Sequence, residues 1–307
     1  MFDWDVIVIG GGPAGLAAGL YLVRANLRTL LIEAESFGGK IKNVEWIENY
    51  PGFEGGITGA QLANQMQAQA LKYGLQTENG SVSGVELFSA SRWVSCSDGR
   101  GYTASAIIVA TGSRNKKLNI PGEMELNGKG VFTCAFCDGG QFAGKTVVVC
   151  GGGDSGVTEA LYLAKIASSV ILIEALPEIT ATAILRQRLQ QNPRISVLTG
   201  KKVQAIAGQQ TVEGVQILDA QSGRSEIIRA AGILVDVGMD PVSGFLPEAI
   251  PLDRDGRILV NENMQTSVPF VLAAGDIRSG SPGQVATAVG DGVIAAITAI
   301  KLIQSKV

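Results

Sequence analysis

The feature that most constrains this 307-residue chain is a pattern that occurs twice: a short apolar strand, a glycine-rich turn and a helix. In the first copy, residues 5–9 lead into the turn 10–15 and an Ala/Leu-rich helical segment that ends near residue 25. In the second copy, residues 146–150 lead into the turn 151–156 and a helical segment that ends near residue 167. Strands alternating with helices in this way predict βαβ units with parallel strands. We therefore expect an α/β protein with two Rossmann-like units, each a three-layer structure around a parallel central sheet.

Each copy continues into a second apolar strand, 29–32 or 169–173, which ends at an acidic residue. Glu33 and Glu174 both lie 23 positions after the first glycine of their turn, from 10 to 33 and from 151 to 174. This spacing is typical of dinucleotide-binding units, in which the acid accepts a hydrogen bond from a ribose hydroxyl and the helix N-terminus faces a pyrophosphate. The predicted binding residues of the first turn are Gly10, Gly12, Pro13, Ala14, Gly15 and Glu33, and those of the second are Gly151, Gly153, Asp154, Ser155, Gly156 and Glu174.

Composition excludes several classes of function. The net charge is −3, so no basic field would attract a nucleic acid or an anionic membrane, and neither is expected as a partner. The apolar runs are too short to span a bilayer, and the acidic N-terminus does not resemble a signal peptide, which favours a cytoplasmic location. The chain has no histidine, which excludes Ser-His-Asp and Cys-His triads and any histidine-ligated metal. We expect no metal site.

Two of the four cysteines, Cys134 and Cys137, form a Cys-x-x-Cys-Asp motif between the two glycine-rich turns. A metal clip needs about four ligands, and the chain has no second such pair. A structural disulfide and a redox-active pair both fit the spacing, and a redox pair is favoured here. Cys96, in an alternating strand-like stretch, and Cys150, at the end of a buried strand, are predicted to be plain core thiols.

Taken in order, the motifs resemble the low-molecular-weight, bacterial-type thioredoxin reductases over nearly the whole chain. They are GGGPAG at 10–15, ENYPGF at 48–53, ATG at 110–112, IPGE at 120–123, CAFCD at 134–138, GGGDSG at 151–156 and AAGD at 273–276. The resemblance implies a flavoprotein disulfide reductase architecture and a homodimer. Its FAD-binding domain would be discontinuous, from residues 1–115 and 247–307, with an NAD(P)-type domain inserted at 116–246 that carries the cysteine pair.

The resemblance also implies roles for single residues. Cys137 would be the sulfur nearer the flavin, Cys134 the sulfur that exchanges with a thioredoxin-like protein, and Asp138 the acid that transfers protons. Asp276 would bind the ribityl hydroxyls. The remaining expected FAD contacts are Ala34, Gly39, Lys40, Ile41, Asn49, Thr111, Gly112, Gly275, Gln284 and Val285. Gly283 stands where relatives carry an arginine, and Arg278 is expected to compensate. Phe136 is expected to pack on the flavin or to narrow the approach to the disulfide.

The second dinucleotide unit departs from the family. Members that use NADPH carry His-Arg-Arg and a further Arg at the positions of Glu174, Ala175, Leu176 and Thr180. Losing about two charge-assisted hydrogen bonds to a 2′-phosphate costs about 3–6 kcal/mol, which argues against NADPH. NADH or another adenine dinucleotide fits Glu174, and ferredoxin or another protein is an alternative electron donor. The expected function is an FAD-dependent disulfide oxidoreductase that passes electrons to a thioredoxin-like protein; the alternatives are a dithiol oxidase that uses oxygen and a non-catalytic flavin redox sensor.

Overall fold

The computed structural model describes residues 2–305, and the chain divides into two compact units. Unit 1 contains the chain up to Arg114 and again from Asp240 onward, and unit 2 contains Asn115–Met239. The second boundary thus lies at 239/240 and not at the expected 246/247. The reason is local bonding within unit 1: Thr111 donates its hydroxyl to the Val242 carbonyl at 2.9 Å, and the Val242 amide donates to the Gly112 carbonyl at 3.2 Å.

Unit 1 is built on one mixed sheet in the order β3-β2-β1-β6-β5-β4, with β17 also paired to β6. Its parallel strands are β1 (Trp4–Ile9), β2 (Thr29–Glu33), β3 (Gln76–Asn79), β6 (Gly101–Val109) and β17 (Val271–Ala273). The antiparallel strands β4 (Val82–Leu87) and β5 (Arg92–Cys96) extend one edge. Because β1 pairs with β2 on one side and β6 on the other, the strand order reverses at β1, which is where open α/β sheets bind their ligands.

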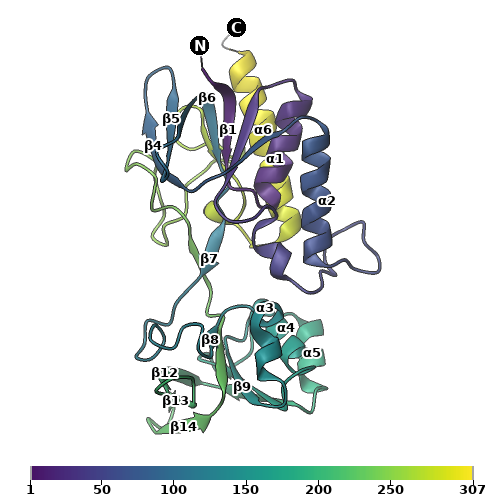
Figure 1. Ribbon diagram of the computed structural model, residues 1–307, viewed down its shortest axis with the longest axis vertical. Helices are drawn as coiled ribbons and strands as arrows, with labels where there is room; N and C mark the ends of the chain where they lie inside the picture. Colours follow the sequence, from purple (N-terminus) through teal and green to yellow (C-terminus); the bar gives the residue numbers. More distant parts are fainter. Residues whose placement is uncertain (1, 306–307) are drawn as a thin grey trace. The chain divides into compact units, whose positions relative to one another are not determined.

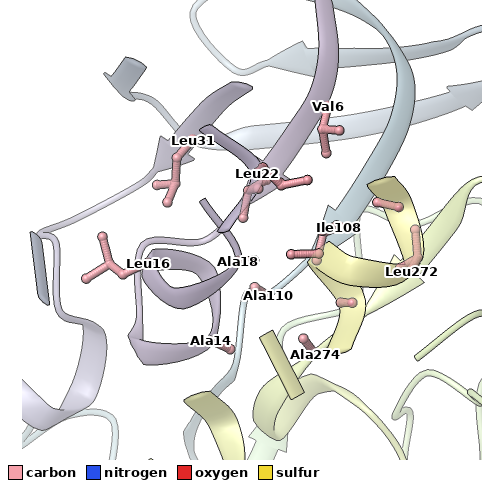
Figure 2. Close-up of a cluster of buried hydrophobic side chains, with 14 of the residues drawn as sticks. Val6, Ala14, Leu16, Ala18, Leu22, Leu31, Ile108, Ala110, Leu272 and Ala274 are labelled. Atoms are coloured by element: carbon pink, nitrogen blue, oxygen red, sulfur yellow. The ribbon is translucent and has the colours of Figure 1, made fainter. Parts of the chain in front are cut away.

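Three helices lie together beside this sheet: α1 (Pro13–Arg24), α2 (Gly59–Lys72) and α6 (Val285–Gln304) (Figure 1). Figure 2 shows part of one buried cluster, which contains Leu16 and Leu22 of α1 together with Val6, Ile108 and Leu272 from three strands. Two short 3₁₀ helices, η1 (Gly39–Asn43) and η3 (Gly275–Ile277), follow β2 and β17. The core therefore fixes α1, and with it the glycine-rich turn at the start of α1.

Helix α6 is long and apolar enough to cross a membrane by length and composition alone, the only such helix in residues 2–305. One face of α6 is nevertheless buried in the core of unit 1, with Ala295, Ala296 and Ala299 fully buried. Gly292 lies so close to α1 that a Cβ there would overlap the Ala14 carbonyl oxygen. These contacts are those of a core helix packed on its neighbour.

Unit 2 has a parallel sheet in the order β11-β10-β9-β15-β8 and a smaller antiparallel sheet in the order β12-β13-β14. The parallel strands are β8 (Val131–Phe132), β9 (Thr146–Cys150), β10 (Ser169–Glu174), β11 (Ile195–Thr199) and β15 (Gly232–Val235). The antiparallel strands are β12 (Lys201–Ala207), β13 (Gly214–Asp219) and β14 (Ser225–Arg229). The helices are α3 (Ala135–Asp138), the 3₁₀ turn η2 (Gly139–Phe142), α4 (Asp154–Leu163) and α5 (Ala183–Gln190). Where the chain passes between the units, β7 (Ser113–Asn115) pairs with β16 (Met239–Pro241).

Candidate functional site

Three of the four glycines in the first turn have different steric surroundings. Gly10 has φ +106°, and a Cβ on it would overlap the carbonyl oxygen of Ala110. A Cβ on Gly15 would overlap the Gly10 carbonyl oxygen, so this glycine lets α1 pack on the turn. Gly12, in contrast, faces open space, with no atom within 4 Å of a Cβ placed there. The turn is therefore closed on the protein side and open where a pyrophosphate would approach the backbone.

The second turn repeats this arrangement in unit 2. Gly151 has φ +124° and sits against the Asp236 carbonyl, and Gly156 packs on the Gly151 carbonyl. Gly153 has only the Thr180 hydroxyl within reach, at 3.9 Å from a Cβ. No side chain caps the start of α1 or of α4, which leaves both helix N-termini to an anionic ligand.

Glu33 and Glu174 make matching hydrogen bonds. Glu33 accepts from the Gly11 amide at 2.6 Å and from the Glu35 amide at 2.8 Å. Glu174 accepts from the Gly152 amide at 2.6 Å and from the Leu176 amide at 2.8 Å. The loop after each acid also returns to the turn, because the Gly38 amide donates to the Gly11 carbonyl and the Thr180 amide to the Gly152 carbonyl. Each carboxylate is thus fixed beside its turn with remaining lone pairs for ribose hydroxyls.

The other predicted FAD residues of unit 1 lie on segments that surround the first turn. Gly39, at the start of η1, would bring a Cβ within 3.2 Å of the Gly12 Cα, and Gly275 would bring one within 3.0 Å of the Ala14 Cβ. Asn49 donates its side-chain amide to Gln284, just before α6, at 3.0 Å. Asp276 accepts from the Ser281 hydroxyl at 3.2 Å. Ala34 and Lys40 are exposed near the turn. Ile41 is the buried residue of η1, and Val285 is the first residue of α6.

Arg278, the residue expected to compensate for the arginine missing at Gly283, forms an ion pair inside unit 1. Its guanidinium forms two hydrogen bonds with the Asp291 carboxylate of α6, from Nε at 2.7 Å and from Nη2 at 2.9 Å. Asp291, only 5% exposed, also accepts from the Gly275 amide at 3.2 Å. The pair ties the Asp276 turn to α6 and engages the Arg278 guanidinium within unit 1.

The cysteine pair lies on a short helical turn of unit 2. Cys134 and Cys137 form a disulfide, and the Cys137 amide donates to the Cys134 sulfur at 3.1 Å. Cys137 and Asp138 are exposed, Cys134 is half-buried, and Ala135 between the sulfurs is fully buried. Phe136, 50% exposed, contacts the Tyr162 ring of α4 with centroids 5.8 Å apart. The disulfide is therefore open to a second thiol, while the turn behind it is anchored on α4.

Two residues that sequence reasoning missed hold these loops in place. Glu159 of α4 accepts from the Ala135 amide at 2.6 Å, directly after Cys134. Asp291 is the only acidic residue in α6, and the residues around it are apolar. An acid in such a segment indicates a buried charge that needs a partner, so the sequence did contain a signal for this residue. Glu159 gave no comparable signal, because acids are common on exposed helix faces.

The two remaining cysteines are buried and unpaired by disulfide, as expected. Burial raises the pKa of the Cys150 thiol to about 12, with a further contribution from the charges of Glu174 and Asp236. Among residues 2–305, no cluster of three or more acidic or cysteine side chains is placed to hold a metal.

Comparison with known proteins identifies the family. Residues 4–292 match the model of the pyridine nucleotide-disulphide oxidoreductases. The chain is 40% identical to the bifunctional thioredoxin reductase/thioredoxin of Mycobacterium leprae, over 96% of its own length and 65% of that protein's. It is 40% identical to the thioredoxin reductase of Bacillus subtilis, over 95% of this chain and 92% of that one. The crystal structure of Lactococcus lactis thioredoxin reductase superposes with a TM-score of 0.96 at 35% identity, covering 99% of this chain and 100% of that one. The chain therefore belongs to the thioredoxin reductase family, whose members are flavoprotein oxidoreductases with Rossmann-type domains.

Proposed function

We propose that this protein is an FAD-dependent disulfide oxidoreductase that reduces a thioredoxin-like partner and takes its electrons from a donor other than NADPH. The observation that carries the proposal is the accessible Cys134–Cys137 disulfide, held in the same unit as a dinucleotide turn whose neighbouring loop, residues 175–182, contains no Lys or Arg. A cytoplasmic homodimer is part of the proposal.

Unit 1 would hold FAD at its first glycine-rich turn. Gly12 leaves room for the pyrophosphate, Glu33 would bind the adenosine ribose, and Asp276 would bind the ribityl chain. FAD, when bound, would supply a carrier that accepts two electrons from a donor and delivers them to a disulfide.

The cysteine pair would reduce the partner by thiol–disulfide exchange. The Cys134 thiolate attacks one sulfur of the partner disulfide, which breaks that bond, forms a mixed disulfide and releases the partner's first thiolate. The Cys137 thiolate then attacks the Cys134 sulfur, restores the Cys134–Cys137 disulfide and releases the partner's second thiolate. Asp138, exposed beside Cys137, would carry the protons that the released thiolates need.

The donor site would be the second glycine-rich turn. Its acid, turn and returning loop repeat the contacts of the first turn one by one, which supports an unphosphorylated adenosine as the ligand. Residues 175–182 contain no Lys or Arg and contain Glu178, so a 2′-phosphate would meet only negative charge there. NADH is the first candidate, and another adenine dinucleotide fits the same contacts.

Anaerobic bleaching of the flavin absorbance tests the donor. The purified protein is mixed separately with NADH, NADPH, reduced ferredoxin and a dithiol, and we expect NADH to bleach the flavin faster than NADPH. Fast bleaching by micromolar NADPH would contradict the donor proposal, bleaching by ferredoxin alone would favour a protein donor, and rapid peroxide formation from a dithiol in air would favour an oxidase.

Thioredoxin turnover tests the cysteine pair. Cys137→Ser is expected to abolish reduction of a thioredoxin disulfide while the protein keeps its yellow flavin. Unchanged turnover in this variant would refute the mechanism.

A further inference from the structure

One face of α4 anchors the redox turn. Glu159, Tyr162 and Leu163 are three and four positions apart, so they share a side of the helix. Glu159 accepts from the Ala135 amide, Tyr162 contacts the Phe136 ring, and Leu163 lies 3.2 Å from a Cβ placed on Gly139. The turn that carries the disulfide is therefore bound to α4 at three successive points.

Of these three contacts, only the Glu159 contact carries a charge. Its oxygen is 2.6 Å from the backbone nitrogen of Ala135, the residue covalently next to Cys134. Cys134 occupies the cap position of α3, where its sulfur accepts from the Cys137 amide. A thiolate at such a position is stabilised by the backbone N–H groups around it and destabilised by a nearby negative charge.

We propose that Glu159 is a positioning residue that also sets the reduction potential of the Cys134–Cys137 couple. Its carboxylate accepts the hydrogen bond of the Ala135 amide and places a negative charge next to the residue that follows Cys134. This charge disfavours the Cys134 thiolate. Since the disulfide carries no charge, the carboxylate makes the reduced form less stable relative to the disulfide, and the pair becomes a stronger reductant. This inference rests on the proposed redox role of the pair.

Glu159→Gln is the decisive variant, because glutamine keeps an oxygen acceptor for the Ala135 amide and removes the negative charge. Glu159→Ala removes both. Glu226→Gln removes one exposed carboxylate from β14 of the same unit and serves as the matched charge control.

The holoprotein is equilibrated without oxygen in mixtures of reduced and oxidised dithiothreitol, quenched in acid, unfolded and alkylated with a mass-tagged maleimide. Each dithiothreitol that closes to its cyclic disulfide gives up two electrons and two protons, and these convert Cys134–Cys137 into two thiols. Flavin absorbance records electrons on the flavin separately. Thermal unfolding confirms that each variant is folded.

We expect Glu159→Gln to shift the equilibrium about tenfold toward the dithiol, equivalent to a midpoint about 30 mV less negative, with Glu159→Ala shifting at least as far and Glu226→Gln unchanged. A wild-type midpoint in Glu159→Gln would overturn the inference, as would a shift in Glu159→Ala alone, or an equal shift in Glu226→Gln. If Glu159→Ala does not fold, the midpoints of Glu159→Gln and of the Glu226→Gln control decide whether the inference holds. A wild-type pair that no dithiothreitol ratio reduces would instead contradict the proposed function.

Discussion

Replacing three residues of the second nucleotide loop should reverse its preference between NAD⁺ and NADP⁺. The variant Glu174→Ala/Ala175→Arg/Thr180→Arg removes the acid and adds two cations. Ala175 and Thr180 are both exposed, so arginines there can extend without displacing the core. The Thr180 amide is fixed by the Gly152 carbonyl at 3.1 Å and the Thr182 amide by Asp154 at 2.6 Å, so the loop itself should keep its course.

The size of the effect follows from the bonds gained and lost. Two new charge-assisted hydrogen bonds to a 2′-phosphate are worth about 1.5–3 kcal/mol each, and exposure of the arginines places them near the lower end. The total of about 3 kcal/mol corresponds to roughly 10²-fold tighter NADP⁺ binding. NAD⁺ binding should weaken by about tenfold, because an alanine side chain accepts no hydrogen bond from the ribose and the Gly152 amide loses the Glu174 carboxylate as its partner.

Isothermal titration with NAD⁺ and NADP⁺ gives both affinities for the wild-type protein and the variant. A control that carries Gln209→Arg/Gln210→Arg adds two cations to an exposed turn of the same unit and leaves Glu174 in place. Wild-type protein that binds NADP⁺ as tightly as NAD⁺, or a control that gains NADP⁺ affinity as strongly as the variant, would refute the reasoning.

Four single positions give three further predictions. Gly12→Val should fold but bind FAD at least about tenfold more weakly, since its Cβ meets no protein atom and the side chain fills the space of the pyrophosphate. Gly15→Ala should instead lower the yield of folded protein, because its Cβ would overlap the Gly10 carbonyl oxygen. Flavin content measures the first effect and circular dichroism the second. Asp291→Asn should destabilise unit 1 by about 3 kcal/mol, because the half-buried Arg278 is left without a counter-charge. Thermal unfolding followed by flavin fluorescence would show no change if the pair is unimportant. Burial raises the pKa of Cys150 to about 12 in the folded protein, above the ordinary value near 9, so the thiol's contribution to stability is complete below pH 9 and is lost as pH rises from 9 toward 12. In wild-type protein the free energy of unfolding should fall by about 1.4 kcal/mol at pH 10 through this group, and Cys150→Ala should lack that fall. Equal alkaline unfolding curves for the two proteins would contradict this.

The parts of the molecule that sequence reasoning predicted well are those governed by local patterns. The turns at Gly10 and Gly151 are recognisable because both positions have a positive φ and leave no room for a Cβ, so only glycine fits. The acids at 33 and 174 follow at a distance that is fixed by the length of one helix and one strand. Cys96 was predicted as a buried thiol because it lies in an alternating strand-like stretch, and Cys150 because it ends a buried apolar strand. Local patterns of this kind persist in any fold that uses the unit.

The parts that could not be predicted depend on which distant segments meet. The boundary at 239/240 is set by Val242 returning to Gly112, a contact between residues 130 apart that no local pattern records. The ion pair of Arg278 was not predicted, because its partner, Asp291, lies about a turn and a half into the next helix. Glu159 was passed over because its role depends on α3 packing against α4.

Helix α4 gives a physical reason why the redox turn and the second nucleotide turn belong to one unit. Its first residues continue the turn at Gly153, and Glu159, Tyr162 and Leu163 hold the disulfide turn about one and a half to two and a half helical turns later. A packed helix of this length does not bend appreciably, so the spacing between the two turns is fixed by the 1.5 Å rise of each intervening residue. A change of the loop after Glu174 would therefore alter the nucleotide that binds without disturbing the sulfur chemistry. The loop is bonded to Gly152, just before α4, whereas the disulfide turn is bonded to the second half of the helix. This separation allows the electron donor to diverge within the family while the Cys-x-x-Cys-Asp turn keeps its geometry.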